Sequence, residues 1–295
     1  MMLAMPTALV LTRQSDSYSA FRFMEAAKRH SLPLELLDPH LLYLYVIDGQ
    51  SQVALNGRAL DAAELRVIPR LGSTATEYSL AALELLEQAG ARSLNPSSAL
   101  FAMRNKFIAL AALSAAGIPV PESAMLRAPC DIAPVIERLG GYPVVLKFIR
   151  GSQGVGVIYA PDETAVTSVL EAMNLIQYDV LVQRYYPWAA QRDVRVLVLG
   201  GEARWAVERV SGGGRFRSNF HRGGQAGAVE LPVEAVELAV RAAGVFRLGL
   251  AGVDLIESPG GLLVMEVNSS PGFETIETVH SVDVAAEILR FALSG

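Results

Sequence analysis

The chain has 295 residues, of which 52% are hydrophobic and 19% are charged. This length accommodates two or three packed subdomains, and so apolar a composition excludes a disordered chain. The net charge of −5 argues against direct nucleic-acid binding, which usually requires a basic face. The single cysteine, Cys130, excludes an internal disulfide and a cysteine-based metal cluster.

The sequence gives no sign of a targeting or membrane segment. The N-terminus lacks the basic start and the small-residue cleavage site of a signal peptide. The longest uncharged stretch, residues 107–121, contains one glycine and two prolines and is shorter than the ~20 apolar residues that span a bilayer. We therefore expect a cytoplasmic protein without a membrane partner.

The first third of the chain predicts a small parallel α/β unit. Strand-like and helical segments alternate, with strands at residues 8–13, 32–38 and 64–72 and helices at residues 18–30 and 77–90. Strands that alternate with helices are typical of a parallel sheet. Gly90 and the segment Asn-Pro-Ser-Ser at 95–98 punctuate its end, so we place a domain boundary near residue 95.

The middle of the chain continues with a helix and then a set of strands. We expect a helix at residues 104–117, strands at 142–149, 155–160 and 179–186, and a further helix at 162–174. Gly117 stands at the C-cap of the first helix, and Pro119 follows it. The last third predicts two strands joined by a Gly-Gly turn at 193–210, a polar loop at 211–224, a helix at 232–248, two more strands at 251–272 and a final helix at 281–293.

Two carboxylates and an amide gather on the strands at 251–272. Glu266 and Asn268 are two residues apart, so they share one face of a strand, and Asp254 lies roughly opposite on the partner strand. The flanking residues are apolar, where a carboxylate is unfavourable unless a cation neutralises it. Three hard oxygen donors suit Mg²⁺ bound together with phosphates. The alternative is an edge hairpin with solvated acids.

A glycine-rich segment, Gly-Ser-Gln-Gly-Val-Gly at 151–156, directly follows the strand that carries Lys147. Glycines allow backbone N–H groups to approach phosphate oxygens, and a lysine adds a point charge. The segment is not a Walker A loop, and a plain tight hairpin is the alternative interpretation. Lys147 either snorkels at an edge or contacts an anion, and Lys106 could equally be a surface lysine.

A locally basic segment, Arg-Phe-Arg-Ser-Asn-Phe-His-Arg at 215–222, lies in the polar loop. Arg217 and Arg222 could bind a carboxylate or phosphate through paired hydrogen bonds, with Asn219 and His221 beside them. The alternative is a solvated basic loop. We assign no proton-transfer role to His221.

These segments, in this order, resemble the ATP-grasp superfamily, and within it the RimK-type glutamate ligases. The specific segments are Phe-Arg-Ser-Asn-Phe-His-Arg-Gly-Gly at 216–224 and Met-Glu-Val-Asn-Ser-Ser-Pro-Gly at 265–272, and the similarity extends over the whole chain. The resemblance implies an N-terminal parallel α/β domain, at residues 1–95, before an ATP-grasp domain at residues 96–295. In the latter, two α+β lobes, about 96–180 and 181–295, clasp ATP.

The resemblance also implies roles for individual residues. ATP would be bound by Lys106, Lys147, Gly151, Ser152, Gln153, Gly154, Gly156, Gln183, Arg184, Tyr185, Tyr186, Asp193, Arg217, Ser218 and Asn219. Arg217 and Asn219 would serve catalysis at the transferred phosphate, and Asp254, Glu266 and Asn268 would hold Mg²⁺ or Mn²⁺. Arg184 departs from the family pattern, which has an acidic residue at the adenine edge in this position.

The implied reaction joins a carboxylate to an amine through an acyl phosphate. The resemblance suggests glutamate as the amine and the C-terminus of a ribosomal protein or peptide as the acceptor, in a homo-oligomeric enzyme. Arg70, at a strand end of the N-terminal unit, His221 and Arg222 are the candidates for substrate contact. The other acceptors are a small molecule, a cofactor or a carrier protein, and a non-catalytic ATP-binding module is the alternative of another class.

Overall fold

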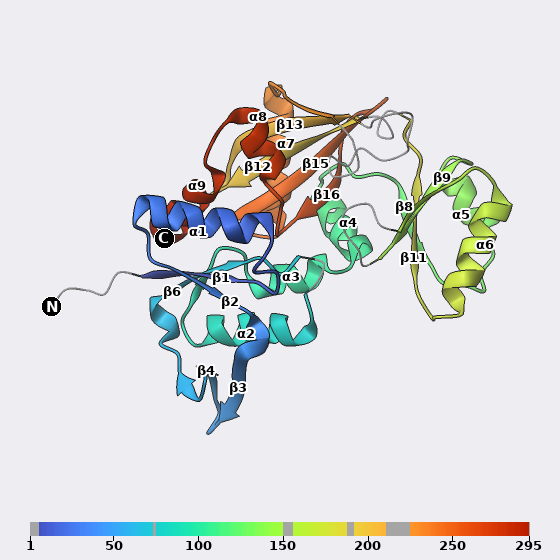
Figure 1. Cartoon of the computed structure of the whole chain (residues 1–295). Coiled ribbons are helices and arrows are strands. Elements are labelled where there is room, and N and C mark those ends of the chain that lie inside the picture. Colours follow the sequence, from blue (N-terminus) through green and yellow to red (C-terminus); the bar gives the residue numbers. More distant parts are fainter. Residues whose placement is uncertain (1–5, 73–74, 150–155, 188–191, 211–224, 295) are drawn as a thin grey trace.

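The computed structural model describes residues 6–72, 75–149, 156–187, 192–210 and 225–294. Within these ranges an α/β unit is followed by two α+β lobes, each built on an antiparallel sheet (Figure 1). No helix in these ranges has the length and apolar character needed to cross a membrane.

The N-terminal unit is a parallel sheet with the strand order β2-β1-β6-β7. Its elements are β1 (Thr7–Leu11), β2 (Leu34–Leu37), β6 (Leu65–Pro69), β7 (Arg92–Ser93), α1 (Tyr18–His30) and α2 (Glu77–Gln88). Successive residues of β1 face opposite layers, because side chains alternate along a strand. Ala8 and Val10 pack in the layer of α1, and Leu9 and Leu11 in the layer of α2. The predicted strands and helices of this unit are confirmed.

A small antiparallel sheet projects from this unit and was not predicted (Figure 1). It consists of β3 (Leu42–Ile47), β4 (Gln50–Leu55) and β5 (Arg58–Ala59), flanked by short 3₁₀ turns at Pro39–Leu41 and Ala62–Glu64. Two-residue turns, Asp48-Gly49 and Asn56-Gly57, connect the strands, and all four residues have positive φ. Asp-Gly and Asn-Gly between apolar runs indicate such hairpins, so the signal was present in the sequence.

The first lobe is a four-stranded sheet with the order β10-β9-β11-β8. Its elements are β8 (Ser123–Leu126), β9 (Val144–Phe148), β10 (Val157–Ala160), β11 (Val180–Arg184), α5 (Ala133–Arg138) and α6 (Glu163–Asn174). The helices bury Ile136, Val166 and Leu170 against the sheet. The lobe boundary expected near residue 180 falls at the first residue of β11. Because all of β11 pairs with β9, we place the boundary after Arg184.

The second lobe is a five-stranded sheet with the order β14-β13-β12-β15-β16. Its strands are β12 (Arg192–Leu199), β13 (Glu202–Val210), β14 (Gln225–Ala228), β15 (Leu250–Ser258) and β16 (Gly261–Asn268), and its helices are α7 (Val233–Val245), α8 (Glu274–His280) and α9 (Val284–Ser294). Val196 and Val198 of β12 pack in the core with α7, whereas Leu197 and Leu199 pack in the core with α8 and α9.

Helix α4 (Lys106–Ala115), which follows α3 (Ser97–Met103), lies between the two lobes (Figure 1). Leu113 belongs to the core of the second lobe, while Leu110 packs with Ile149 and Leu181 of the first. The side chain of Asn105 accepts hydrogen bonds from two backbone N–H groups and so caps the helix at its N-terminus. This arrangement fixes Lys106, the first residue of α4, at the junction of the lobes.

Candidate functional site

Strands β15 and β16 bring the two predicted acids together. Asp254 pairs directly with Glu266, and Gly252 pairs with Asn268, in the antiparallel register of the hairpin. Asp254 is buried, with 5% of its surface exposed. The amide nitrogen of Asn268 donates to the carbonyl of Gly252 at 3.3 Å, which leaves the amide oxygen without a hydrogen bond among the described residues. The side chains of Asp254, Glu266 and Asn268 therefore lie close together at one end of the hairpin.

Two arginines hold Asp254, and both were missed by the sequence analysis. Arg195 of β12 donates two hydrogen bonds of 2.7 Å to its carboxylate, and Arg209 of β13 approaches it at 3.2 Å. Although burial by itself would raise the pKa of Asp254, these guanidinium groups hold it below its ordinary value. Both strands carry several charged residues, so the strand register was needed to connect these two arginines to Asp254.

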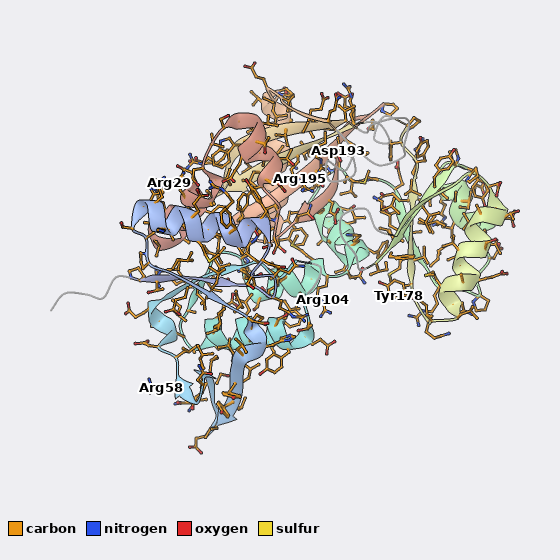
Figure 2. The ribbon with its side chains drawn as sticks, viewed as in Figure 1. Arg29, Arg58, Arg104, Tyr178, Asp193 and Arg195 are labelled. Atoms are coloured by element: carbon orange, nitrogen blue, oxygen red, sulfur yellow. The ribbon has the colours of Figure 1, made fainter. Side chains whose placement is uncertain are left out.

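Arg209 also donates two hydrogen bonds, of 2.6 and 2.7 Å, to Asp193. Asp193 and Arg195 lie on the second lobe near its junction with the first (Figure 2). Each carboxylate oxygen of Asp193 accepts one of these hydrogen bonds, and the expected contact of Asp193 with ATP stays a prediction.

Two lysines from outside the second-lobe sheet reach the same place. Lys106, at the start of α4, forms an ion pair with Glu266 at 2.6 Å. Lys147 of β9 is enclosed between the lobes, where its ammonium group donates to Gln183 at 2.6 Å and contacts the sulfur of Met265 at 3.0 Å. Burial lowers the pKa of Lys147 to about 8, and the charge of Glu266 opposes that shift. Lys106 thus connects α4, and Lys147 connects β9, to β16 of the acidic hairpin.

Residues 183–186, which we expect to bind ATP, lie at the end of β11 and directly after it. Gln183 is buried and bonded to Lys147, whereas Arg184 faces the other way and contacts Glu122 at 3.4 Å. Burial and a hydrogen bond to Glu122 raise the pKa of Tyr186 to about 12. Tyr185 packs edge-to-face on Tyr159 at 5.1 Å. The side chain of Arg184 therefore lies on the face of the strand opposite to Lys147.

The base of the glycine-rich segment is a β-hairpin formed by β9 and β10, in which Val157 pairs with Lys147. Gly156 has φ of +76°, and a Cβ there would lie 2.3 Å from the ring of Phe148, so only glycine fits. The other candidate residues of this segment and of the basic loop lie outside the described residues: Gly151, Ser152, Gln153, Gly154, Arg217, Ser218, Asn219, His221 and Arg222.

Arg70 lies apart from the acidic hairpin, directly after β6. Its Nε and Nη1 atoms are enclosed and have no hydrogen-bond partner among the described residues, and its guanidinium carbon lies 5.7 Å from the centre of the Phe273 ring. Burial lowers its pKa to about 10.

The site as a whole fits a polyanion together with a divalent cation. Four cationic side chains (Lys106, Lys147, Arg195 and Arg209) outnumber three carboxylates (Asp193, Asp254 and Glu266). The described residues contain no cluster of three His, Cys, Asp or Glu side chains that could hold a metal by themselves. The donor set of two carboxylates and one amide oxygen suits Mg²⁺ that is also bound by phosphates.

Comparison with known proteins identifies the family of this chain. The RimK-like ATP-grasp domain matches residues 103–292, and the RimK PreATP-grasp domain matches residues 7–100. A probable alpha-L-glutamate ligase of Ectopseudomonas mendocina is 39% identical over 282 residues, which cover 96% of this chain and 93% of that protein. The ribosomal protein bS6–L-glutamate ligase of Escherichia fergusonii is also 39% identical, over 96% of this chain and 94% of that protein.

Solved structures show the same fold at lower identity. A RimK domain protein ATP-grasp from Sphaerobacter thermophilus aligns with a TM-score of 0.74 at 22% identity, over 97% of this chain and 98% of that chain. The ATP-grasp ligase PsnB, complexed with minimal precursor, Mg and ADP, aligns with a TM-score of 0.73 at 19% identity, over 98% of this chain and 97% of that one.

The fold and the site define an ATP-grasp protein, as the sequence resemblance implied. The chain belongs to the RimK-like ATP-grasp family. It is accordingly an ATP-dependent ligase that forms carbon–nitrogen bonds.

Proposed function

We propose that this chain joins the amine of L-glutamate to the C-terminal carboxylate of a protein or peptide, with a ribosomal protein such as bS6 as the acceptor. The observation that carries the proposal is the acidic pair Asp254–Glu266 facing Lys106 and Lys147, which come from elements outside its sheet. The names of relatives at 39% identity support glutamate and bS6 as the substrates.

The chemistry proceeds in two steps between the lobes. An oxygen of the acceptor carboxylate attacks the γ-phosphorus of ATP, and the bond from that phosphorus to ADP breaks, which gives an acyl phosphate. The glutamate amine then attacks the carbonyl carbon, loses a proton, and phosphate leaves as the amide forms. Lys147 and Lys106 offset the charge of the phosphates, so positioning and electrostatic stabilisation supply most of the acceleration.

Asp254, Glu266 and Asn268 would hold Mg²⁺ in this reaction. Bound there, the ion would neutralise part of the charge on the terminal phosphates of ATP. Lys106 must then share Glu266, with which it pairs in this structure at 2.6 Å. We assign contact with the transferred phosphate to Arg217 and Asn219.

The acceptor and the setting are also part of the proposal. A small molecule, a cofactor or a carrier protein is the alternative acceptor. A ribosomal acceptor is consistent with a cytoplasmic enzyme, and we expect a homo-oligomer, which light scattering would test. A regulatory ATP-binding module is disfavoured by the presence of all three oxygen donors.

The decisive experiment measures ADP release from Mg-ATP with each amino acid in turn and a peptide carrying the C-terminal residues of bS6, while mass spectrometry follows the peptide. We expect release that depends on glutamate and a peptide that gains one or more glutamate residues. Release without any amine would indicate a phosphotransferase or an ATPase instead, and no release would indicate a binding module.

The Glu266→Gln variant tests the metal assignment. It removes charge from the donor set with little change of volume, so we expect turnover to fall at least a hundredfold, as for loss of a group that stabilises transition-state charge, while the unfolding midpoint stays close to that of the parent. Glu257→Gln is the matched control, because Glu257 lies on the same hairpin and, within the described part of the chain, pairs only with Arg192 on the surface. Normal activity of Glu266→Gln would remove Glu266 from the metal site.

A further inference from the structure

Arg70 lies where parallel α/β sheets usually bind their ligands. It follows β6, and its backbone N–H donates to the carbonyl of Leu11 at the end of β1 at 2.9 Å. Strands β2 and β6 flank β1 on opposite sides, so the order of the strands reverses at this point of the sheet. Ligands of open α/β sheets bind beyond the carboxyl ends of the strands at such a reversal.

The guanidinium group of Arg70 has no counter-ion in the described part of the chain. Its Nε and Nη1 are enclosed without a hydrogen-bond partner, although the residue as a whole keeps intermediate exposure. It stays charged at neutral pH, because burial lowers its pKa only to about 10. A buried charge without partners destabilises a fold, so its presence here points to a partner that arrives with the ligand.

The carboxylate of Glu277, on the helix that follows Phe273, is bonded to other groups. Glu277 accepts hydrogen bonds from the hydroxyl of Tyr18 at 2.6 Å and from Arg22 at 2.7 Å. Tyr18 and Arg70 both contact the ring of Phe273, so this carboxylate is in the same neighbourhood. Since Glu277 is already paired, it does not neutralise Arg70.

A hydrogen-bonded connection joins the end of β6 to the acidic hairpin. The hydroxyl of Ser270 donates to the carbonyl of Pro69 at 3.2 Å and accepts from the N–H of Gly72 at 3.3 Å. Ser270 follows Asn268 by two residues, so their Cα atoms are at most about 7 Å apart. The backbone on both sides of Arg70 is therefore hydrogen-bonded to the segment that directly follows the acidic hairpin.

We propose that Arg70 binds a substrate carboxylate that is not phosphorylated in the reaction, an inference that rests on the proposed ligase function. Glutamate has two such carboxylates when it reacts through its amine, and an acceptor that ends in glutamate has one. A guanidinium group donates a charge-assisted hydrogen bond to a carboxylate, here from Nη2, the one nitrogen of Arg70 that is not enclosed. It also stabilises the anion and weakens it as a nucleophile, which suits a carboxylate that remains unchanged. A substrate without this group leaves the arginine unpaired and is rejected.

The test compares Arg70→Met with Arg66→Met, a control on β6, the strand that precedes Arg70; Nη1 of Arg66 donates to the carbonyls of Ala63 and Leu65, while its Nε is enclosed without a partner among the described residues. KM is measured separately for L-glutamate, for the bS6 C-terminal peptide and for ATP. In Arg70→Met we expect KM for either glutamate or the peptide to rise at least a hundredfold, KM for ATP to change less than twofold, and the melting temperature not to fall. The substrate whose KM rises identifies the source of the carboxylate.

Two results would overturn the inference: unchanged KM values for glutamate and the peptide, or a rise confined to ATP. The Arg66→Met control should leave all three KM values unchanged.

Calorimetric binding of L-glutamate and of the peptide, with a non-hydrolysable ATP analogue, separates this inference from the ligase proposal because it needs no turnover. Binding by the parent chain that is lost in Arg70→Met supports the role of Arg70 even if no amine releases ADP. Equal binding by both, or binding of neither probe by the parent, refutes it. Normal turnover in Arg70→Met would refute the role of Arg70 and leave the ligase proposal standing.

Discussion

Lys147 is a cation whose immediate partners are neutral. Its ammonium group contacts the amide oxygen of Gln183 on β11 and the thioether of Met265 on β16. Within the described residues no carboxylate is hydrogen-bonded to it. Its lowered pKa of about 8 follows from this enclosure. A bound phosphate would restore the ordinary preference for the charged form.

At the residue scale we therefore expect nucleotide binding to take up a proton above pH 8. The affinity for ATP should fall about tenfold between pH 7 and pH 9, because an increasing fraction of free protein must first protonate Lys147. Calorimetry in buffers of different ionisation enthalpy measures the uptake. Lys147→Met should bind ATP weakly at both pH values without taking up a proton. Proton uptake that persists in this variant would assign the titration to another group.

At the scale of elements, an ion-pair network fastens α1 of the N-terminal unit to α8 and α9 of the second lobe. Arg22 of α1 contacts Glu277 at 2.7 Å and Asp283 at 3.1 Å, and it also pairs with Glu25. Only 6% of the Glu277 side chain and 13% of that of Arg22 are exposed, so the pair is shielded from water and salt. Glu277 also accepts from the backbone N–H of Ala285 at the start of α9.

Removing this carboxylate should loosen the contact between the elements. We expect Glu277→Ala to lower the free energy of unfolding by about 3 kcal/mol, because it leaves the buried Arg22 without its main partner. Urea denaturation measures the loss. Glu25→Ala, which removes a more exposed partner of the same arginine, should cost less than about 1 kcal/mol. Equal losses of unfolding free energy in the two variants would show that burial does not determine how much each ion pair contributes.

At the scale of the whole molecule, the N-terminal unit and the second lobe share one hydrophobic core. Residues of β1, β6 and α1 pack with residues of β12, α8 and α9, although they come from opposite ends of the chain (Figure 1). Asn95, at the predicted domain boundary, strengthens this junction through hydrogen bonds to the backbone of Leu250 and Ser269 at 2.6–2.9 Å. The first lobe has a separate core built on α5 and α6.

The two cores should respond differently to truncation. Leu289→Ala in α9 should cost about 3 kcal/mol and speed amide exchange in both the second lobe and β1 and β6 of the N-terminal unit. Leu170→Ala in α6 should speed exchange in the first lobe and leave β1 protected. Hydrogen-exchange mass spectrometry distinguishes the two patterns. Loss of protection confined to α9 in Leu289→Ala would show that the shared core does not unfold as one unit.

Local sequence patterns were enough to predict most elements and the acidic hairpin. The Gly-Gly turn between β12 and β13, the end of α4 before Gly117 and the pairing of Asp254 with Glu266 each depend on neighbours within about a dozen residues. The small sheet β3-β4-β5 was missed, although its Asp-Gly and Asn-Gly turns were present. The family resemblance supplied the roles of the lysines, which composition and spacing had left open.

The tertiary structure decided which charges meet and which are left alone. The ion pairs of Arg195 and Arg209 with Asp254 depend on the register of the strands. The contact of Lys147 with Met265 depends on how the two lobes pack against each other. The surroundings of Arg70 depend on Phe273, which packs against its guanidinium group, and on Glu277, which is bonded to Arg22 instead. Both lie about 200 residues away in the chain. Burial and partnership are set by packing between distant segments, and no local pattern of residues encodes them.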